Sequence, residues 1–154
     1  MTSKQPSSYY CFICGRKSPV GLKMSFYSTG PGEVMAEYTV PDIYQGYPGV
    51  VHGGITAAMM DETAGRAVMS DGAFQFFMTL KLEIKYRQPV PTETPLKIVG
   101  RLTSIRGRRA TCHGEIRLPD GSVAAEADLL LVRIPESMME GVDQEALGWR
   151  VYDD

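Results

Sequence analysis

The stretch VVHGGITAAMMDETAG, residues 50–65, decides the fold, because it joins a glycine-rich helix start to a mostly apolar run. From residue 55 to residue 69 the chain is rich in Ala and Met and has almost no polar face, which is typical of a helix buried on most sides. Gly53 and Gly54 mark its beginning, and residues 70–72 (Ser-Asp-Gly) mark its end. We expect the rest of the chain to wrap around this helix.

Alternating apolar and polar residues predict strands on both sides of the helix. The expected strands are residues 23–28 and 33–40 before it, and 74–87, 96–105, 110–118 and 122–133 after it. In residues 74–87 one face is apolar and the other polar, so one is expected in the core and the other in water or at an interface. Pro119-Asp120-Gly121 predicts a hairpin turn. The order β-β-α-β-β-β-β predicts an α+β fold, with an antiparallel sheet curled around one long helix.

Length and composition indicate one globular domain with irregular ends. The 154 residues are 44% hydrophobic and 22% charged, with a net charge of −2, which gives no reason to expect nucleic-acid binding. Residues 23–135 form the expected domain. Residues 1–22 form an irregular segment, with residues 1–8 expected to be disordered, and residues 136–154 form either a short helix or a loose tail.

The chain shows no sign of a membrane or secretory segment. No apolar run approaches the ~20 residues of a membrane span, and the first residues lack the apolar core of a secretory signal. The three cysteines are an odd number, which argues against a secreted disulfide framework. We therefore expect a cytoplasmic protein without membrane partners.

Cys11 and Cys14 have the spacing of half a zinc site. A structural zinc site needs four ligands, and no second cysteine pair follows. Cys112, His113, His52 or a second copy of the pair from another protomer remain as candidate partners. We favour two packed thiols, and we expect no metal and no cofactor.

Two carboxylates, Asp61 and Glu62, lie near the middle of the apolar helix. A carboxylate in such a helix usually has a partner or a chemical role, because burying it unpaired is costly. Arg66 follows Glu62 at the i,i+4 spacing of an ion pair, whereas Asp61 has no such partner on the helix. Asp61 is therefore the better catalytic candidate. At the helix start, the unpaired N–H groups and the helix dipole favour an oxygen that gains negative charge.

Residues 46–54 (GYPGVVHGG), followed by Asp61 and Glu62, resemble the signature of the hotdog-fold acyl-CoA thioesterases. The most similar branches of this 4-hydroxybenzoyl-CoA thioesterase-like superfamily are the phenylacetate-degradation type and the mammalian thioesterase-superfamily-member type. The resemblance runs from about residue 11 to residue 135, because residues 78–80 and 86–91 also fit the family's next strand. It implies a hotdog fold and hydrolysis of an acyl-CoA.

The resemblance also assigns expected roles. The N–H of Gly54, with that of Gly53, would hold the thioester carbonyl oxygen, and Asp61 would be the general base or the nucleophile. Thr79 would lie near the attacking water, with an ordinary strand hydroxyl as the alternative, and His52 would orient the loop or touch substrate, unless it is purely structural. In this fold the helix start of one protomer faces the carboxylate of another. The resemblance thus implies a homodimer or a homotetramer made of two dimers, with the active site at the interface.

Further residues are expected to contact the substrate: Gln45, Met60, Glu62, Arg106, Arg108 and Arg109. Gln45 lies near the place where other branches orient the water. Together with Arg101, the arginines cluster around one expected turn, where guanidinium groups suit the phosphates of coenzyme A or simply form a solvated tip. Met60 would line an acyl tunnel or belong to the core.

Two other functions stay open at this point. The chain is alternatively a non-catalytic acyl-CoA-binding module, or a hotdog enoyl-CoA hydratase or dehydratase. The second requires a different arrangement of histidine and acidic residues, which this chain lacks. The acyl group and the choice between dimer and tetramer are not encoded in any motif that we identify.

Overall fold

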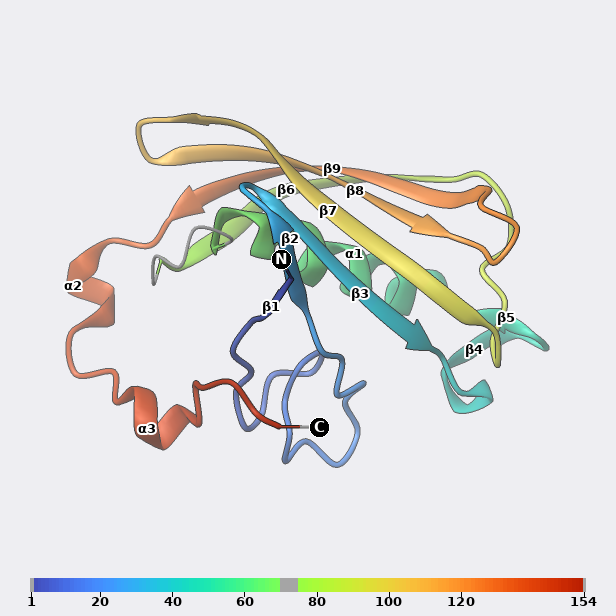
Figure 1. Ribbon diagram of the computed structural model, residues 1–154, viewed down its shortest axis with the longest axis horizontal. Helices are drawn as coiled ribbons and strands as arrows, with labels where there is room; N and C mark the ends of the chain where they lie inside the picture. The colour runs from blue at the N-terminus through green and yellow to red at the C-terminus, as the bar shows by residue number, and fades with distance from the viewer. Residues whose placement is uncertain (1, 70–74, 154) are drawn as a thin grey trace.

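The computed structural model describes residues 2–69 and 75–153. Within these residues an antiparallel sheet of seven strands lies over one long helix, α1 (Gly53–Gly65) (Figure 1). The strand order is β1-β2-β3-β7-β8-β9-β6. The strands are β1 (Ser3–Lys4), β2 (Tyr27–Gly30), β3 (Glu33–Thr39), β6 (Phe77–Tyr86), β7 (Pro95–Arg106), β8 (Arg109–Arg117) and β9 (Val123–Arg133). The expected architecture is therefore confirmed.

Smaller elements flank α1 and end the chain. A short 3-10 helix (Asp42–Tyr44) leads into a two-stranded ribbon, β4 (Gln45–Tyr47) and β5 (Val50–Val51), which ends at the start of α1. After α1 the chain continues as a 3-10 turn, Arg66–Met69. The helices α2 (Glu136–Met139) and α3 (Gln144–Leu147) follow the sheet.

Helix α1 packs directly on the sheet because two glycines leave room for it. Gly100 on β7 and Gly114 on β8 lie opposite each other in register. A Cβ at Gly100 would lie only 2.7 Å from the Cα of Ala64, so that only a residue without a side chain fits there. Met60 and Ala64, both fully buried, lie on the side of α1 that faces this surface.

The strands lie close to the expected positions, with two corrections at element ends. The first strand begins at residue 27 rather than 23. The helix was expected over residues 55–69 but ends at Gly65 and tightens into the 3-10 turn. The expected stop at residues 70–72 lies outside the described residues. The hairpin turn is confirmed, with Gly121 at φ +86°.

Strand β6 departs from the simple alternation. Leu82 and Ile84 are partly buried, but Met78 is 51% exposed and Leu80 and Tyr86 are each 55% exposed. A register shift between Thr79 and Lys81 interrupts the pairing with β9. Since β6 is the last strand of the sheet, three of its six apolar side chains stay exposed to solvent in a single chain.

The N-terminal segment, residues 5–26, covers α1 on the side away from the sheet (Figure 1). The expected disorder of residues 1–8 is wrong for the described part, because β1 pairs with β2 and Gln5 and Ser7 are buried. The C-terminal tail is not loose either. It carries the helices α2 and α3, and Arg150 forms a bridge with Ser7.

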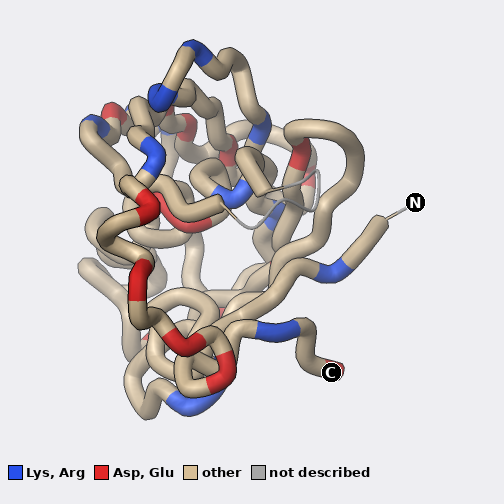
Figure 2. The backbone as a smooth tube through the Cα atoms, turned by 90° about the vertical axis from the view of Figure 1, so that its left-hand side faces the viewer, with Lys and Arg blue, Asp and Glu red and all other residues tan. Residues whose placement is uncertain are grey.

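Charges are interspersed along the chain. Figure 2 shows basic and acidic positions mixed over the backbone, which fits the net charge of −2. No helix among the described residues is long and apolar enough to cross a bilayer.

Candidate active site

Asp61 and Thr79 meet between α1 and β6. The Thr79 hydroxyl donates a hydrogen bond of 2.7 Å to Asp61 Oδ1. The helix places Asp61 on the side of α1 that faces the end of the sheet, and the irregular pairing of β6 lies directly after Thr79. As expected, the Asp61 side chain has no hydrogen-bond partner on its own helix among the described residues, and its partner Thr79 lies on strand β6. Both side chains are accessible to solvent.

A hollow of about 240 Å³ opens beside this pair. Its lining is mainly apolar and aromatic and includes Phe76, Phe77, Leu131 and Trp149. The Trp149 ring comes from the C-terminal tail and lies 5.8 Å from the Phe76 ring, centroid to centroid. The sequence analysis missed Trp149, and the only signal was its position as the sole tryptophan of the chain.

The start of α1 is capped by His52. Its imidazole Nδ1 accepts a hydrogen bond of 2.9 Å from the N–H of Gly54. The N–H groups of Ile55 and Thr56 both donate to the His52 carbonyl. The N–H of Gly53 has no acceptor among the described residues. Of the two amides expected to polarise a carbonyl, the one at Gly54 is therefore occupied and the one at Gly53 is free.

A second hollow, of about 890 Å³, lies at this helix start. His52, Gly53, Tyr47 and Tyr86 contribute to its lining. The Tyr86 hydroxyl donates a 2.7 Å hydrogen bond to the Gly53 carbonyl, which ties the helix start to β6. The free amide and the carboxylate of Asp61 thus line different hollows of one chain.

Met60 and Glu62, which were expected to contact the substrate, have other partners in the structure. Met60 is fully buried, close to Gly114 on β8, and so belongs to the core because α1 presses this face on the sheet. Glu62 borders the hollow at Asp61, but its carboxylate pairs with Arg66 at 2.8 Å, as the i,i+4 spacing predicted. Its other oxygen lies 4.0 Å from Cys11 Sγ.

Gln45 and the arginines lie on the surface. Gln45 is exposed on β4, one residue after Tyr44, whose carbonyl accepts from the N–H of His52. Arg106 and Arg109 pair across the β7–β8 turn, and Arg108 between them donates to the Arg133 carbonyl. Arg101 is not at this turn, because it lies in the middle of β7 opposite His113.

The cysteine pair lies against α1, and none of its three expected partners in the same chain joins it. His52 caps the helix start, Cys112 is buried in the sheet, and His113 binds Asp128 through Nδ1 at 2.8 Å. Burial raises the pKa of Cys112 to about 12. The hydrogen bond with Cys11, assisted by Arg66, lowers the pKa of Cys14 to about 6.

The sequence was compared with protein families and with characterised proteins. Residues 48–125, about half of the chain, match the sequence model of the thioesterase superfamily. The acyl-coenzyme A thioesterase THEM4 of Rattus norvegicus is 40% identical over 91 residues, which are 58% of this chain but only 38% of that protein. The chain thus spans well under half of the length of this relative.

Solved structures agree with the fold. A thioesterase superfamily protein is 32% identical with a TM-score of 0.73, covering 80% of this chain and 63% of its own. A hypothetical thioesterase from Streptococcus pneumoniae, solved with coenzyme A, is 22% identical with a TM-score of 0.63, covering 68% of this chain and 80% of its own. The sheet around one helix is therefore the hotdog fold.

Proposed function

This chain belongs to the thioesterase superfamily, and on that premise we propose that it hydrolyses an acyl-coenzyme A thioester to the free acid and coenzyme A. The rat relative is named an acyl-coenzyme A thioesterase, and the streptococcal structure of the same fold contains coenzyme A. Both support a coenzyme A thioester as the substrate class.

The observation that carries the proposal is the 2.7 Å hydrogen bond between Thr79 and Asp61 beside a hollow. This bond fixes the carboxylate in one orientation while leaving its second oxygen for water or substrate. Asp61 acts as general base towards a water molecule, or itself attacks the carbonyl carbon. As general base, Asp61 takes a proton from water, the water oxygen bonds to the carbonyl carbon, the carbon–sulfur bond breaks, and the thiolate of coenzyme A leaves and takes up the proton. As nucleophile, Asp61 forms a mixed anhydride with loss of the same thiolate, and water then hydrolyses the anhydride to the free acid and restores Asp61.

The carbonyl oxygen binds at a helix start, where the amide of Gly53 provides the donor. Its N–H is free, whereas the N–H of Gly54 would first have to leave His52 Nδ1. A free amide at the positive end of the helix dipole stabilises the negative charge that develops on the oxygen. His52 then serves mainly to shape the helix start.

The helix start that completes the site belongs to a second copy of the chain. Asp61 lies eight residues after Gly53 along α1, a rise of about 12 Å, which is too far for both to act on one thioester. The exposed apolar side chains of β6, Met78 and Leu80, provide a surface on which a partner would pack. A homodimer, or a tetramer made of two such dimers, would bring the two halves together.

The arginines of the β7–β8 turn bind the phosphates of coenzyme A in this proposal. Arg109 pairs with Val132 on β9, and Val132 pairs with Met78 on β6, next to Thr79. Two strand spacings, about 10 Å, separate Arg109 from this part of β6. The turn therefore lies at the same end of the sheet as Asp61, within reach of an extended cofactor-sized substrate.

The test is thiol release from short, medium, long and aromatic acyl-CoAs by wild-type protein and by Asp61→Asn. We expect Asp61→Asn to lower kcat by about 10²–10⁴-fold, the usual contribution of a general base. Asp128→Asn is the matched control, because Asp128 is exposed on β9, pairs with His113 and lines neither hollow. Equal loss in both variants would contradict the role of Asp61.

Binding without turnover is the second candidate, favoured by the occupied amide of Gly54. Calorimetric binding of acyl-CoA with no thiol release by wild-type protein would support it over hydrolysis. Hydration of an enoyl-CoA with its thioester intact would instead support the hydratase alternative.

The cytoplasmic location stays a prediction.

A further inference from the structure

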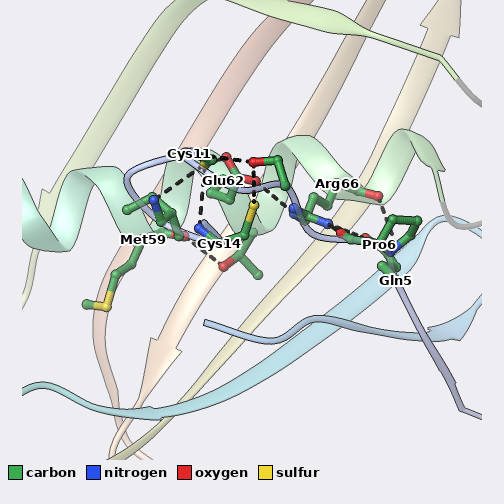
Figure 3. Close-up of polar contacts among 10 residues, drawn as sticks. Gln5, Pro6, Cys11, Cys14, Met59, Glu62 and Arg66 are labelled. Atoms are coloured by element: carbon green, nitrogen blue, oxygen red, sulfur yellow. Dashed lines mark hydrogen bonds and ion pairs between the residues drawn. The ribbon is translucent and has the colours of Figure 1, made fainter. Parts of the chain in front are cut away.

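The turn of the N-terminal segment that carries Cys11 and Cys14 faces Glu62 on α1 (Figure 3). The two sulfur atoms and a carboxylate oxygen of Glu62 all lie within 4.8 Å of one another. Cys14 is buried, while Cys11 and Glu62 are partly buried, so the group is sheltered but keeps access to solvent. Three groups with metal-binding chemistry thus converge from two parts of the chain that are about 50 residues apart.

Two backbone donors of the turn favour a thiolate at Cys11, whereas the hydrogen bond with Cys14, burial and the Glu62 carboxylate raise the pKa of the free thiol. The N–H groups of Ile13 and Cys14 point at Cys11 Sγ, at 3.4 and 3.5 Å. Such backbone donors stabilise a thiolate, which is the form of cysteine that binds metal. The turn closes through a 2.7 Å hydrogen bond from the Gly15 N–H to the Cys11 carbonyl. Only glycine fits there, because a Cβ would lie 2.3 Å from that carbonyl oxygen.

Glu62 is oriented for the same purpose by Arg66. The Arg66 guanidinium holds Oε1 at 2.8 Å and leaves Oε2 on the side of the thiols, 4.0 Å from Cys11 Sγ. Arg66 is itself fixed by a 2.8 Å hydrogen bond to the Pro6 carbonyl and by its position over the Phe26 ring. Outer partners of this kind orient the carboxylates of metal sites.

We propose that Cys11, Cys14 and Glu62 bind one zinc ion, with water as the fourth ligand. Zinc–sulfur distances of about 2.3 Å and zinc–oxygen distances of about 2.0–2.2 Å place tetrahedral ligands about 3.3–3.8 Å apart. The two sulfur atoms and the carboxylate oxygen, which lie within 4.8 Å of one another, would move closer together by up to about 1 Å to reach this spacing. Two thiolates and the carboxylate carry three negative charges, which a divalent cation and Arg66 together balance. The ion ties residues 5–26 to α1, one residue away from Asp61.

The geometry fits this site better than a redox-active dithiol. Reactive cysteine pairs of that kind gain their thiolate from a helix N-terminus or from a nearby cation. Here the pair lies in a turn. Arg66 favours the thiolate of Cys14, but the Glu62 carboxylate lies 4.0 Å from Cys11 Sγ and also faces the pair. A carboxylate in this position opposes a free thiolate but favours a bound cation.

The experiment titrates fully reduced, tag-free protein with Co²⁺ and then displaces it with Zn²⁺. We expect one Co²⁺ per chain, with a thiolate-to-metal charge-transfer band and the intense visible bands of tetrahedral coordination. Cys11→Ser and Glu62→Gln should weaken binding by more than the roughly 10–100-fold that loss of an outer partner costs. Cys112→Ala is the matched control and should bind as the wild type does, because Cys112 lies in the sheet.

Circular dichroism of each variant shows whether it is folded, so that a lost site is separated from a lost fold. The Co²⁺ spectrum reads the metal directly and does not depend on thioesterase activity. A reduced wild-type protein without a tetrahedral Co²⁺ spectrum would overturn the proposal, and so would an unchanged spectrum in Cys11→Ser. A Cys11–Cys14 disulfide that forms in air despite equimolar Zn²⁺, seen as a mass loss of two hydrogens, would also overturn it.

Discussion

Asp61 and Glu62 are neighbours in the sequence and border the same hollow, yet their carboxylates have different partners. Asp61 faces β6, where its partner is a neutral hydroxyl and a hollow lies beside it. Glu62 faces the N-terminal segment, where it is held by Arg66, which is only 3% exposed. Because a helix turns by about 100° per residue, adjacent side chains meet different surroundings. The comparison teaches that the carboxylate with the weaker partner is the one available for chemistry.

The largest effect on stability is expected at Glu62. Glu62→Gln leaves the buried Arg66 without its ion pair, and we expect the free energy of unfolding of the metal-free protein to fall by about 3–5 kcal/mol. Asp61→Asn should cost only about 1 kcal/mol, since it weakens one hydrogen bond. Urea denaturation of both variants checks the difference.

The control for Glu62 is Glu126→Gln. Glu126 pairs with Arg87 at 2.7 Å on the surface, where such a pair contributes about 0–1 kcal/mol. Equal losses of unfolding free energy in Glu62→Gln and Glu126→Gln would show that burial of the Glu62–Arg66 pair does not add to stability. That result would contradict the contrast drawn between Asp61 and Glu62.

The second prediction addresses the chemical region at the start of α1. Gly53→Pro removes the free N–H while keeping the backbone, because proline is favoured at the first helical position and His52 before it is extended, with ψ 134°. We expect kcat to fall by about 10²–10³-fold, the usual effect of removing one oxyanion donor. Steady-state thiol release measures it.

Gly53→Ala is the matched control for this variant. It keeps the N–H, and its Cβ would meet the Tyr86 hydroxyl oxygen at an ordinary 3.5 Å. Its kcat should stay within a few-fold of the wild type. A similar loss in both variants would assign the effect to the shape of the helix start rather than to the amide.

A smaller effect is expected where α1 rests on the sheet. Gly100→Ala places a Cβ 2.7 Å from the Ala64 Cα and should destabilise the protein by about 1–3 kcal/mol, as overpacking does. At Gly65, by contrast, a Cβ meets nothing within 4 Å, so Gly65→Ala should stabilise by about 0.5–1 kcal/mol. Thermal unfolding of the two variants should shift in opposite directions, and shifts in the same direction would contradict the close helix–sheet contact.

The smallest effect belongs to the helix cap. His52→Ala removes the acceptor for the Gly54 N–H and should cost about 1 kcal/mol, whereas His52→Ser restores a capping oxygen and should recover most of it. Urea midpoints report both. An alanine variant as stable as the wild type would show that the His52 hydrogen bond does not contribute to stability.

The elements that could be predicted from the sequence depend on local spacing. The strands, the helix and the Glu62–Arg66 pair follow from periods of two and of about 3.6 residues. The approach of Cys11 to Glu62 could not be predicted, because it depends on how residues 5–26 cross α1. The position of Trp149 likewise depends on the packing of the tail. The hydrogen bond from Thr79 to Asp61 depends on how β6 is positioned relative to α1, which local spacing does not predict. Thr79 was a candidate only because of the family resemblance.

The central claim is that one chain supplies Asp61 and a second chain supplies the helix start with Gly53. The most direct test purifies a mixed dimer of Asp61→Asn and Gly53→Pro through two different affinity tags. Each variant alone should be nearly inactive, but the mixed dimer contains one site in which both groups are intact. We predict roughly half of the wild-type activity per dimer, because a two-fold interface creates two equivalent sites. A mixed dimer no more active than its parents would contradict the claim.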